Sequence, residues 1–120
     1  MYRNAGASPT SRSELNLNKM LALSAKFGNP HLSIPCVHIA GTNGKGTVTI
    51  KTATAFQKMN LKTGMFISPH ISTFRERITI NNEMITEEQV VNYSQQVFDK
   101  IKTHDLEVTF FEIVTMIAFL

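Results

Sequence analysis

The stretch HIAGTNGKGTVTI, residues 38–50, sets the expected architecture of this chain. A short apolar run leads into a loop with three glycines and one lysine, and a segment of helical length follows. Glycine lets a ligand approach the backbone closely, and the first turn of a helix presents N–H groups at the positive end of its dipole. The pattern therefore predicts an anion site between a strand and a helix.

The loop has the chemistry of a phosphate-binding P-loop without matching its strict pattern. Lys45 supplies a charge that reaches terminal phosphates, and Thr47 supplies a hydroxyl for a metal ion. In the pattern G-x-x-x-x-G-K-[ST] the first glycine would fall on Ile39, and Gly46 replaces the hydroxyl residue that follows the lysine. A shorter variant of the P-loop is expected, and the alternative is a glycine-rich turn with a solvated lysine.

The segments around this loop predict strands alternating with helices. Residues 33–40, SIPCVHIA, form an apolar β-branched run that is typical of a buried strand, with Cys36 as a small core residue. Residues 45–60 predict a helix, and residues 62–68 predict a second strand. A strand, a tight turn, a helix and another strand make a βαβ unit, which implies a parallel sheet. The expected fold class is α/β.

Capping boxes mark three helix starts, at Ser11 with Glu14, Thr86 with Gln89, and Thr109 with Glu112. Residues 76–86 alternate and then turn at Asn81-Asn82, which predicts a small hairpin. The helix after Thr86 is expected to bury Val90, Val91, Val97, Phe98 and Ile101. Residues 1–12 are expected to be a disordered tail, and residues 13–120 to form part of one domain.

Composition narrows the class of protein. The net charge of +3 is mild, and neither a dense basic patch nor interleaved aromatic residues indicate a nucleic-acid binder. No apolar run approaches the ~20 residues needed to span a bilayer. A single cysteine fits a reducing compartment, so a cytoplasmic protein is expected, with a mitochondrial one as the alternative. The last residues are apolar without a stop signal, which favours a fragment of a longer protein.

The motif GTNGKGT resembles the loop of the Mur-ligase superfamily, which comprises ATP-dependent ligases that form amide bonds. Gly46 after the lysine makes the chain similar to the folylpolyglutamate synthase and dihydrofolate synthase family. Three further blocks agree in order with that family: FGNP at residues 27–30, ISPHISTFRERI at 67–78 and TFFEIVT at 109–115. Residues 13–120 therefore resemble the N-terminal part of a P-loop NTPase-like central domain of the Mur-ligase type, truncated before its second domain.

This resemblance implies an enzyme that adds L-glutamate to a folate or to dihydropteroate, using ATP and Mg²⁺. ATP would phosphorylate the carboxylate of the acceptor, and the amine of glutamate would displace phosphate from the acyl phosphate. Lys45 would be the catalytic residue, holding the β- and γ-phosphates. The nucleotide would also lie on Gly41, Thr42, Asn43, Gly44, Gly46 and Thr47.

The resemblance also assigns residues outside the glycine loop. Ser68 of the SPH block takes the position of a magnesium ligand, and the alternative is a plain Ser-Pro loop. The folate side would include His70, Arg77, Thr109 and Phe111. The alternatives there are a surface pair of Arg77 with Glu76, a helix cap at Thr109 and a core position for Phe111. His38, in the middle of the first expected strand, is expected to be a core histidine.

Several elements of such a ligase are expected beyond residue 120. They include a second, acidic magnesium ligand, a modified lysine and the glutamate site of the C-terminal domain, so the fragment alone is expected to be inactive. The full-length protein is expected to be a monomer without nucleic-acid or membrane partners. Two other interpretations stay open, a truncated non-catalytic nucleotide-binding module and a muramyl-type amide ligase. The motifs do not choose between dihydropteroate and tetrahydrofolate.

Overall fold

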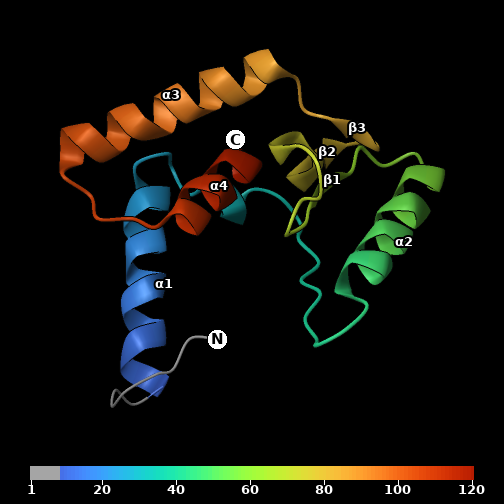
Figure 1. Ribbon diagram of the computed structural model, residues 1–120, viewed down its shortest axis with the longest axis horizontal. Coiled ribbons are helices and arrows are strands. Elements are labelled where there is room, and N and C mark those ends of the chain that lie inside the picture. Colours follow the sequence, from blue (N-terminus) through green and yellow to red (C-terminus); the bar gives the residue numbers. More distant parts are fainter. Residues whose placement is uncertain (1–8) are drawn as a thin grey trace. The chain divides into compact units, whose positions relative to one another are not determined.

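The computed structural model describes the backbone of residues 9–120 and the side chains of residues 17–120 (Figure 1). By contacts these residues divide into two compact units, one of residues up to 34 together with 96–120, and one of residues 35–95. None of the helices within residues 9–120 is both long enough and apolar enough to cross a bilayer. The elements in order are α1 Pro9–Ala25, η1 Pro30–Leu32, α2 Lys45–Lys58, β1 Gly64–Phe66, η2 Phe74–Arg77, β2 Ile78–Ile80, β3 Glu83–Met84, α3 Glu87–His104 and α4 Phe110–Phe119.

The first unit is helical, and its core forms where α1 packs against α4. The most completely buried side chains come from α1, α3 and α4, namely Leu23, Ser24, Val97, Val114 and Met116. The buried hydroxyl of Ser24 lies 2.7 Å from Nδ1 of His31, so a polar group in this core has a hydrogen-bond partner.

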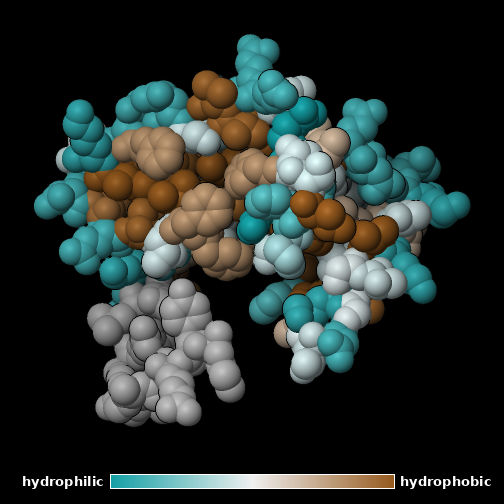
Figure 2. Space-filling model, viewed as in Figure 1, coloured by the Kyte–Doolittle hydropathy of each residue, from teal (hydrophilic) through white to brown (hydrophobic). Residues whose placement is uncertain are grey.

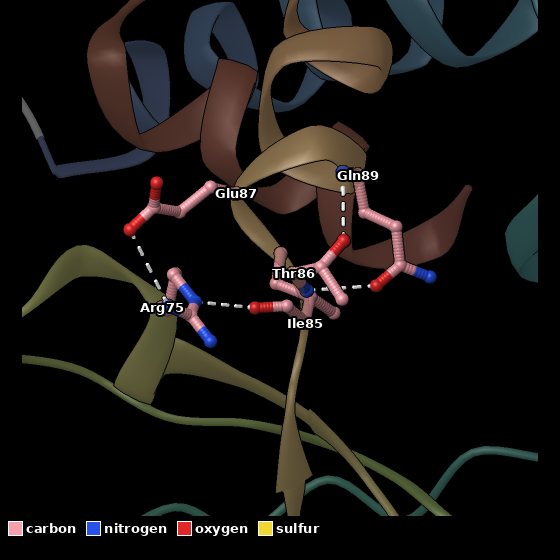
Figure 3. Close-up of polar contacts among 5 residues, drawn as sticks. All are labelled: Arg75, Ile85, Thr86, Glu87 and Gln89. Carbon is pink, nitrogen blue, oxygen red and sulfur yellow. Dashed lines mark hydrogen bonds and ion pairs between the residues drawn. The ribbon is translucent and has the colours of Figure 1, made fainter.

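Two of the three predicted capping boxes are confirmed. At α4 the amide of Thr109 donates to Oε2 of Glu112 at 2.6 Å, and the amide of Glu112 donates to Oγ1 of Thr109 at 3.4 Å. The same exchange joins Thr86 and Gln89 at the start of α3, with distances of 2.8 and 3.1 Å (Figure 3). The third box lies outside the described side chains. Helix α1 begins at Pro9, so residues 9–12 are helical, whereas residues 1–8 lie outside the described part.

The second unit contains a three-stranded antiparallel sheet in the order β1-β2-β3. Gly64 pairs with Ile80 and Phe66 with Ile78 across β1 and β2, and α2 packs beside β1. Its buried side chains are Ala53, Ile78, Thr79 and Ile85. The hairpin predicted at Asn81-Asn82 is confirmed. Both turn residues have positive φ, 50° and 65°, as a type I′ turn requires.

The strand predicted for residues 33–40 is wrong for this structure, which assigns no strand there. Cys36 and His38 are exposed instead of core residues, and Val37 is 62% exposed. A strand needs a neighbouring strand to complete its hydrogen bonds, and the sheet of the described residues contains β1, β2 and β3 only. The fold is α/β with a small antiparallel sheet, and the expected parallel βαβ unit is not found within residues 9–120.

Two expectations about buried residues on the helices are also wrong. In α3, Val97 is fully buried, but Val91 is 68% and Phe98 is 52% exposed. Residues 90, 97 and 101 share a face at helical spacing, whereas residues 91 and 98 lie about 100° away from it. In α4 the alternative of a core position for Phe111 fails, because Phe110 and Phe111 are both exposed. Apolar side chains gather on the surface over α4 (Figure 2).

The hairpin gives a test of how much a single turn contributes to stability. Oδ1 of Asn81 accepts a hydrogen bond from the amide of Thr63 at 2.9 Å, in addition to the positive φ of this residue. Asn81→Ala should lower the free energy of unfolding by about 1–3 kcal/mol, because alanine resists a left-handed backbone and the hydrogen bond is lost. Urea denaturation measures this loss. Glu83→Ala, an exposed change in the same hairpin, should stay within about 0.5 kcal/mol, and equal losses in both variants would contradict the prediction.

Candidate functional site

The glycine loop ends where α2 begins. Gly44 is the N-cap of α2 and has a φ of 76°, a left-handed conformation that favours glycine. The amides of Lys45, Gly46 and Thr47 lie in the first turn, where an α-helix has no intrahelical acceptor for its N–H groups. All residues from 41 to 47 are exposed. The predicted helix after the loop is confirmed, and an anion would meet donors at the positive end of its dipole.

The ammonium group of Lys45 is held by the loop itself. Its Nζ donates to the carbonyl oxygens of Gly41, at 2.5 Å, and Thr42, at 3.3 Å. The side chain therefore folds back over the loop instead of extending into solvent. Residues 41–47 therefore carry both the positive charge of Lys45 and the first-turn amides of α2.

Within the described part of the chain, Gly46 has no steric role in packing. A Cβ atom built at this position finds no heavy atom within 4 Å. The protein itself would accommodate a side chain there, so the absence of one leaves space over the first turn of α2. That space suits a ligand that approaches the backbone closely.

Ser68 lies in the loop that joins β1 to β2. The pairing of these strands extends by one bond, because the amide of Ile67 donates to the carbonyl oxygen of Arg77 at 2.9 Å. The base of the loop is thereby closed. Ser68 is exposed just beyond it, and its peptide bond to Pro69 is cis. Among the described residues no group of three or more His, Cys, Asp or Glu side chains forms a metal site.

His70 and Arg77 are brought together in this loop. Nε of Arg77 donates to Nδ1 of His70 at 2.7 Å, so the neutral imidazole carries its proton on Nε2. The ring of Phe74 meets the imidazole edge-on, with 6.4 Å between centroids. Both residues are half-buried, and two of the four folate-side residues expected from the sequence are therefore direct neighbours.

Sequence reasoning missed the role of Glu76. Its Oε2 accepts from the amide of Ile71 at 2.8 Å, and its Oε1 accepts from the amides of Ser72 and Thr73 at 3.0 and 2.8 Å. Thr73 and Glu76 have the T-x-x-E spacing of a capping box, which is the sequence pattern that would have identified it. The amide of Ile71, followed by that of Thr73, lowers the pKa of this carboxyl below its usual value, against the opposing effect of desolvation.

Arg75 ties the loop to the residues before α3 (Figure 3). Its Nε donates to the carbonyl oxygen of Ile85 at 2.6 Å, and its Nη1 lies 3.6 Å from Oε1 of Glu87. The carboxylate of Glu87 is largely exposed, so the ion pair contributes less than about 1 kcal/mol. The hydrogen bond to a main-chain carbonyl is the stronger reason for the position of Arg75.

Thr109 and Phe111 belong to the first compact unit and are described apart from the two loops. The hydroxyl of Thr109 caps α4, as one alternative for this residue predicted. The side chain of Phe111 is 55% exposed in the first turn of α4, so part of its surface is accessible to a ligand.

Comparisons with known proteins extend these observations. No family model matches the chain. It is 39% identical over 106 residues to the dihydrofolate synthetase of Saccharomyces cerevisiae, covering 88% of this chain and 25% of that protein. It superposes on the folylpolyglutamate synthase of Thermotoga maritima with a TM-score of 0.83 and 40% identity, covering 87% of this chain and 26% of that one. The folylpolyglutamate synthase of Mycobacterium tuberculosis, complexed with ADP and AMPPCP, gives a TM-score of 0.78 and 31% identity, covering 87% and 25%.

The fold is thus that of α/β proteins of the Mur-ligase type, as these superpositions show. Over the part that it covers, the chain is homologous to folylpolyglutamate and dihydrofolate synthases, which confirms the resemblance in its sequence. The chain spans about a quarter of the length of the relatives that it matches.

The lowered pKa of Glu76 gives the sign of a pH dependence. A carboxyl whose pKa is lower in the folded state adds stability above its unfolded value of about 4.5, and this is lost as the pH falls through the folded pKa. Glu76→Gln should therefore destabilise the protein at about pH 7, and the difference from the wild type should shrink in acid, where both side chains are neutral. Urea unfolding at a series of pH values measures this difference. A difference that is independent of pH would contradict the prediction.

Proposed function

We propose that the chain supplies the nucleotide-binding part of an ATP-dependent ligase that adds L-glutamate to a folate or to dihydropteroate. The observation that carries this proposal is the glycine loop of residues 41–47 at the start of α2, in a chain related to folylpolyglutamate and dihydrofolate synthases. A solved relative complexed with ADP and AMPPCP supports nucleotide binding by the full-length protein.

In the proposed reaction the carboxylate oxygen of the acceptor attacks the γ-phosphorus of ATP, and ADP leaves. The amine of glutamate then attacks the acyl carbon, phosphate leaves, and the amine loses a proton as the amide bond forms. Phosphoryl transfer depends mainly on positioning and on stabilising charge at the phosphate oxygens. Lys45 and the first-turn amides of α2 would supply both, with the remaining loop residues, Gly41, Thr42, Asn43, Gly44, Gly46 and Thr47, around the phosphates.

Magnesium would be held through hydroxyl oxygens. Ser68 and Thr47 are both exposed, and hard oxygen ligands together with phosphate oxygens and water are those that Mg²⁺ prefers. A bound Mg²⁺ would neutralise charge on the phosphate oxygens. Ser68 would act as a ligand supplied from the β1–β2 loop.

Acceptor-side residues are proposed separately for each of the two units. Arg77, oriented by its hydrogen bond to His70, carries a planar guanidinium group that suits a carboxylate of the acceptor. Phe111 offers an aromatic surface for a pterin ring, with Thr109 at the start of the same helix.

A parallel sheet, the domain bounds, the oligomeric state and the cellular location belong to the same proposal. Residues 33–40 form no strand here, but they precede the glycine loop, α2 and β1 in the order of a βαβ unit, so we propose that they pair in a parallel P-loop sheet in the full-length protein. The domain of residues 13–120, a monomeric state and a cytoplasmic or mitochondrial location remain proposals as well. Because the chain spans about a quarter of its relatives, the 120 residues alone are not expected to complete the reaction.

An assay of the full-length protein tests the function. ATP- and glutamate-dependent ligation is measured with dihydropteroate and tetrahydrofolate as alternative acceptors. A glutamate added to either acceptor supports the ligase, and the preferred acceptor identifies the activity. Nucleotide binding without ligation would instead favour a non-catalytic nucleotide-binding module.

Lys45→Ala should lower kcat of the full-length enzyme by about 10²–10³-fold, because a cation that stabilises the transferred phosphoryl group is lost. The fold should persist, since the side chain is exposed. Steady-state kinetics measure the loss, and thermal unfolding verifies the fold. Lys51→Ala removes an exposed lysine of the same helix and should keep the wild-type rate. An unchanged rate in Lys45→Ala would overturn the phosphate-binding role.

Phe111→Ala should raise KM for the acceptor by about 2–10-fold, the value of one aromatic contact, while KM for ATP stays constant. Phe110→Ala is the matched control, because Phe110 is an exposed neighbour in the same turn of α4. If both substitutions change KM for the acceptor equally, the pterin contact at Phe111 is wrong.

A further inference from the structure

We infer that Glu76 is a positioning residue, which holds the β1–β2 loop of residues 67–77 in the conformation that brings His70 and Arg77 together. This inference rests on the proposed function, because it assigns these two residues to the acceptor side of the site. It adds a residue that acts through the loop backbone and not through contact with substrate.

Strand pairing fixes only the ends of this loop. Phe66 pairs with Ile78, and the amide of Ile67 bonds to the carbonyl oxygen of Arg77 at 2.9 Å. Residues 68–76 lie between these points, and a closed base leaves many conformations to the residues that it encloses. A further constraint inside the loop is needed to select one of them.

The carboxylate of Glu76 provides this constraint. It accepts from three consecutive backbone amides, those of Ile71, Ser72 and Thr73, over distances of 2.8–3.0 Å. Both of its oxygens take part. Hydrogen bonds from neutral amides to an ionised acceptor are roughly twice as strong as neutral ones, so one side chain orients a whole turn of backbone.

These bonds act directly on the position of His70. The amide of Ile71 is part of the peptide unit that links His70 to Ile71, so Glu76 fixes the backbone on the carboxyl side of His70. Arg77 follows Glu76 in the chain and donates to the imidazole ring at 2.7 Å. Glu76 thus holds the main chain of His70, while its neighbour holds the ring.

The backbone bonds also explain why the role is one of positioning. A carboxylate that accepts three amides has little capacity left for a substrate donor. Glutamine at this position keeps the shape of the side chain but presents one acceptor and one donor, so its NH₂ group faces an amide that also donates. Aspartate keeps the charge and is one methylene shorter, so it reaches fewer of the three amides.

The test compares Glu76→Gln, Glu76→Asp and the control Glu83→Gln in the full-length protein. Glu83 is an exposed residue of β3, so its substitution removes an equal charge from the same unit. The first measurement is amide hydrogen exchange at Ile71, Ser72 and Thr73. Glu76→Gln should speed exchange of these amides about tenfold or more, Glu76→Asp should have a smaller effect, and Glu83→Gln should leave exchange unchanged.

The second measurement separates positioning from a general loss of folded protein. Glu76→Gln should lower kcat/KM for the acceptor by roughly 10–100-fold, because a small misplacement of binding groups is costly, while KM for ATP stays within about twofold. Glu76→Asp should restore part of this loss. A purely structural defect would reduce the active fraction, which lowers the apparent kcat and leaves KM for the acceptor unchanged. Misplaced acceptor-binding groups should instead raise KM for the acceptor.

The outcomes distinguish this inference from the proposed function. If the wild-type protein ligates an acceptor and Glu76→Gln behaves like Glu83→Gln, the inference is overturned and the function stands. If the wild-type protein ligates neither acceptor, the function fails, and faster exchange in Glu76→Gln would show only that the loop is held as described. Unchanged exchange in Glu76→Gln overturns the inference in either case.

Discussion

The pairing of β1 with β2 is the constraint on which the second unit depends. Each strand has only three residues, yet their register brings Ile67 next to Arg77 and so closes the loop that carries Ser68 and His70. β2 is the central strand, paired on one side with β1 and on the other with β3. Strands this short gain little from hydrogen bonds alone, so the burial of Ile78 and Ile85 is needed to stabilise the pairing.

The features that the sequence predicted correctly are those determined by residues close together in the sequence. The hairpin follows from two adjacent asparagines, which tolerate positive φ better than other side chains. The caps of α3 and α4 follow from residues three positions apart. In contrast, a strand at residues 33–40 depends on a partner strand elsewhere in the chain, which no local pattern specifies. Burial of Val91 or Phe98 likewise depends on which face of α3 meets other elements.

The residues of the candidate site also divide into those that a sequence pattern predicted and those that it did not. Lys45 was predictable because glycines and a lysine before a helix have few other uses, and family resemblance drew attention to Ser68, His70 and Arg77. Glu76 was not predicted, although Thr73 and Glu76 have the spacing that identified the other caps. A capping box is usually sought before an amphipathic helix, whereas here a single 3-10 turn leads directly into β2. The bond between Arg77 and His70 has no sequence pattern, because the loop conformation creates it.

The hydrogen bonds of Lys45 to its own loop have a consequence for affinity. A lysine side chain that is disordered in solution gives up about 1.5–2 kcal/mol of rotamer entropy when a ligand immobilises it. In this chain the carbonyl groups of Gly41 and Thr42 already restrict the ammonium group, so folding and not binding bears that entropic cost. When phosphate binds, the ammonium group would exchange its carbonyl acceptors for phosphate oxygens, which carry more charge. The affinity for phosphate would then depend on the free-energy difference between two states in which the Lys45 side chain is ordered. An anion of lower charge would interact with the ammonium group hardly more strongly than the carbonyl groups do.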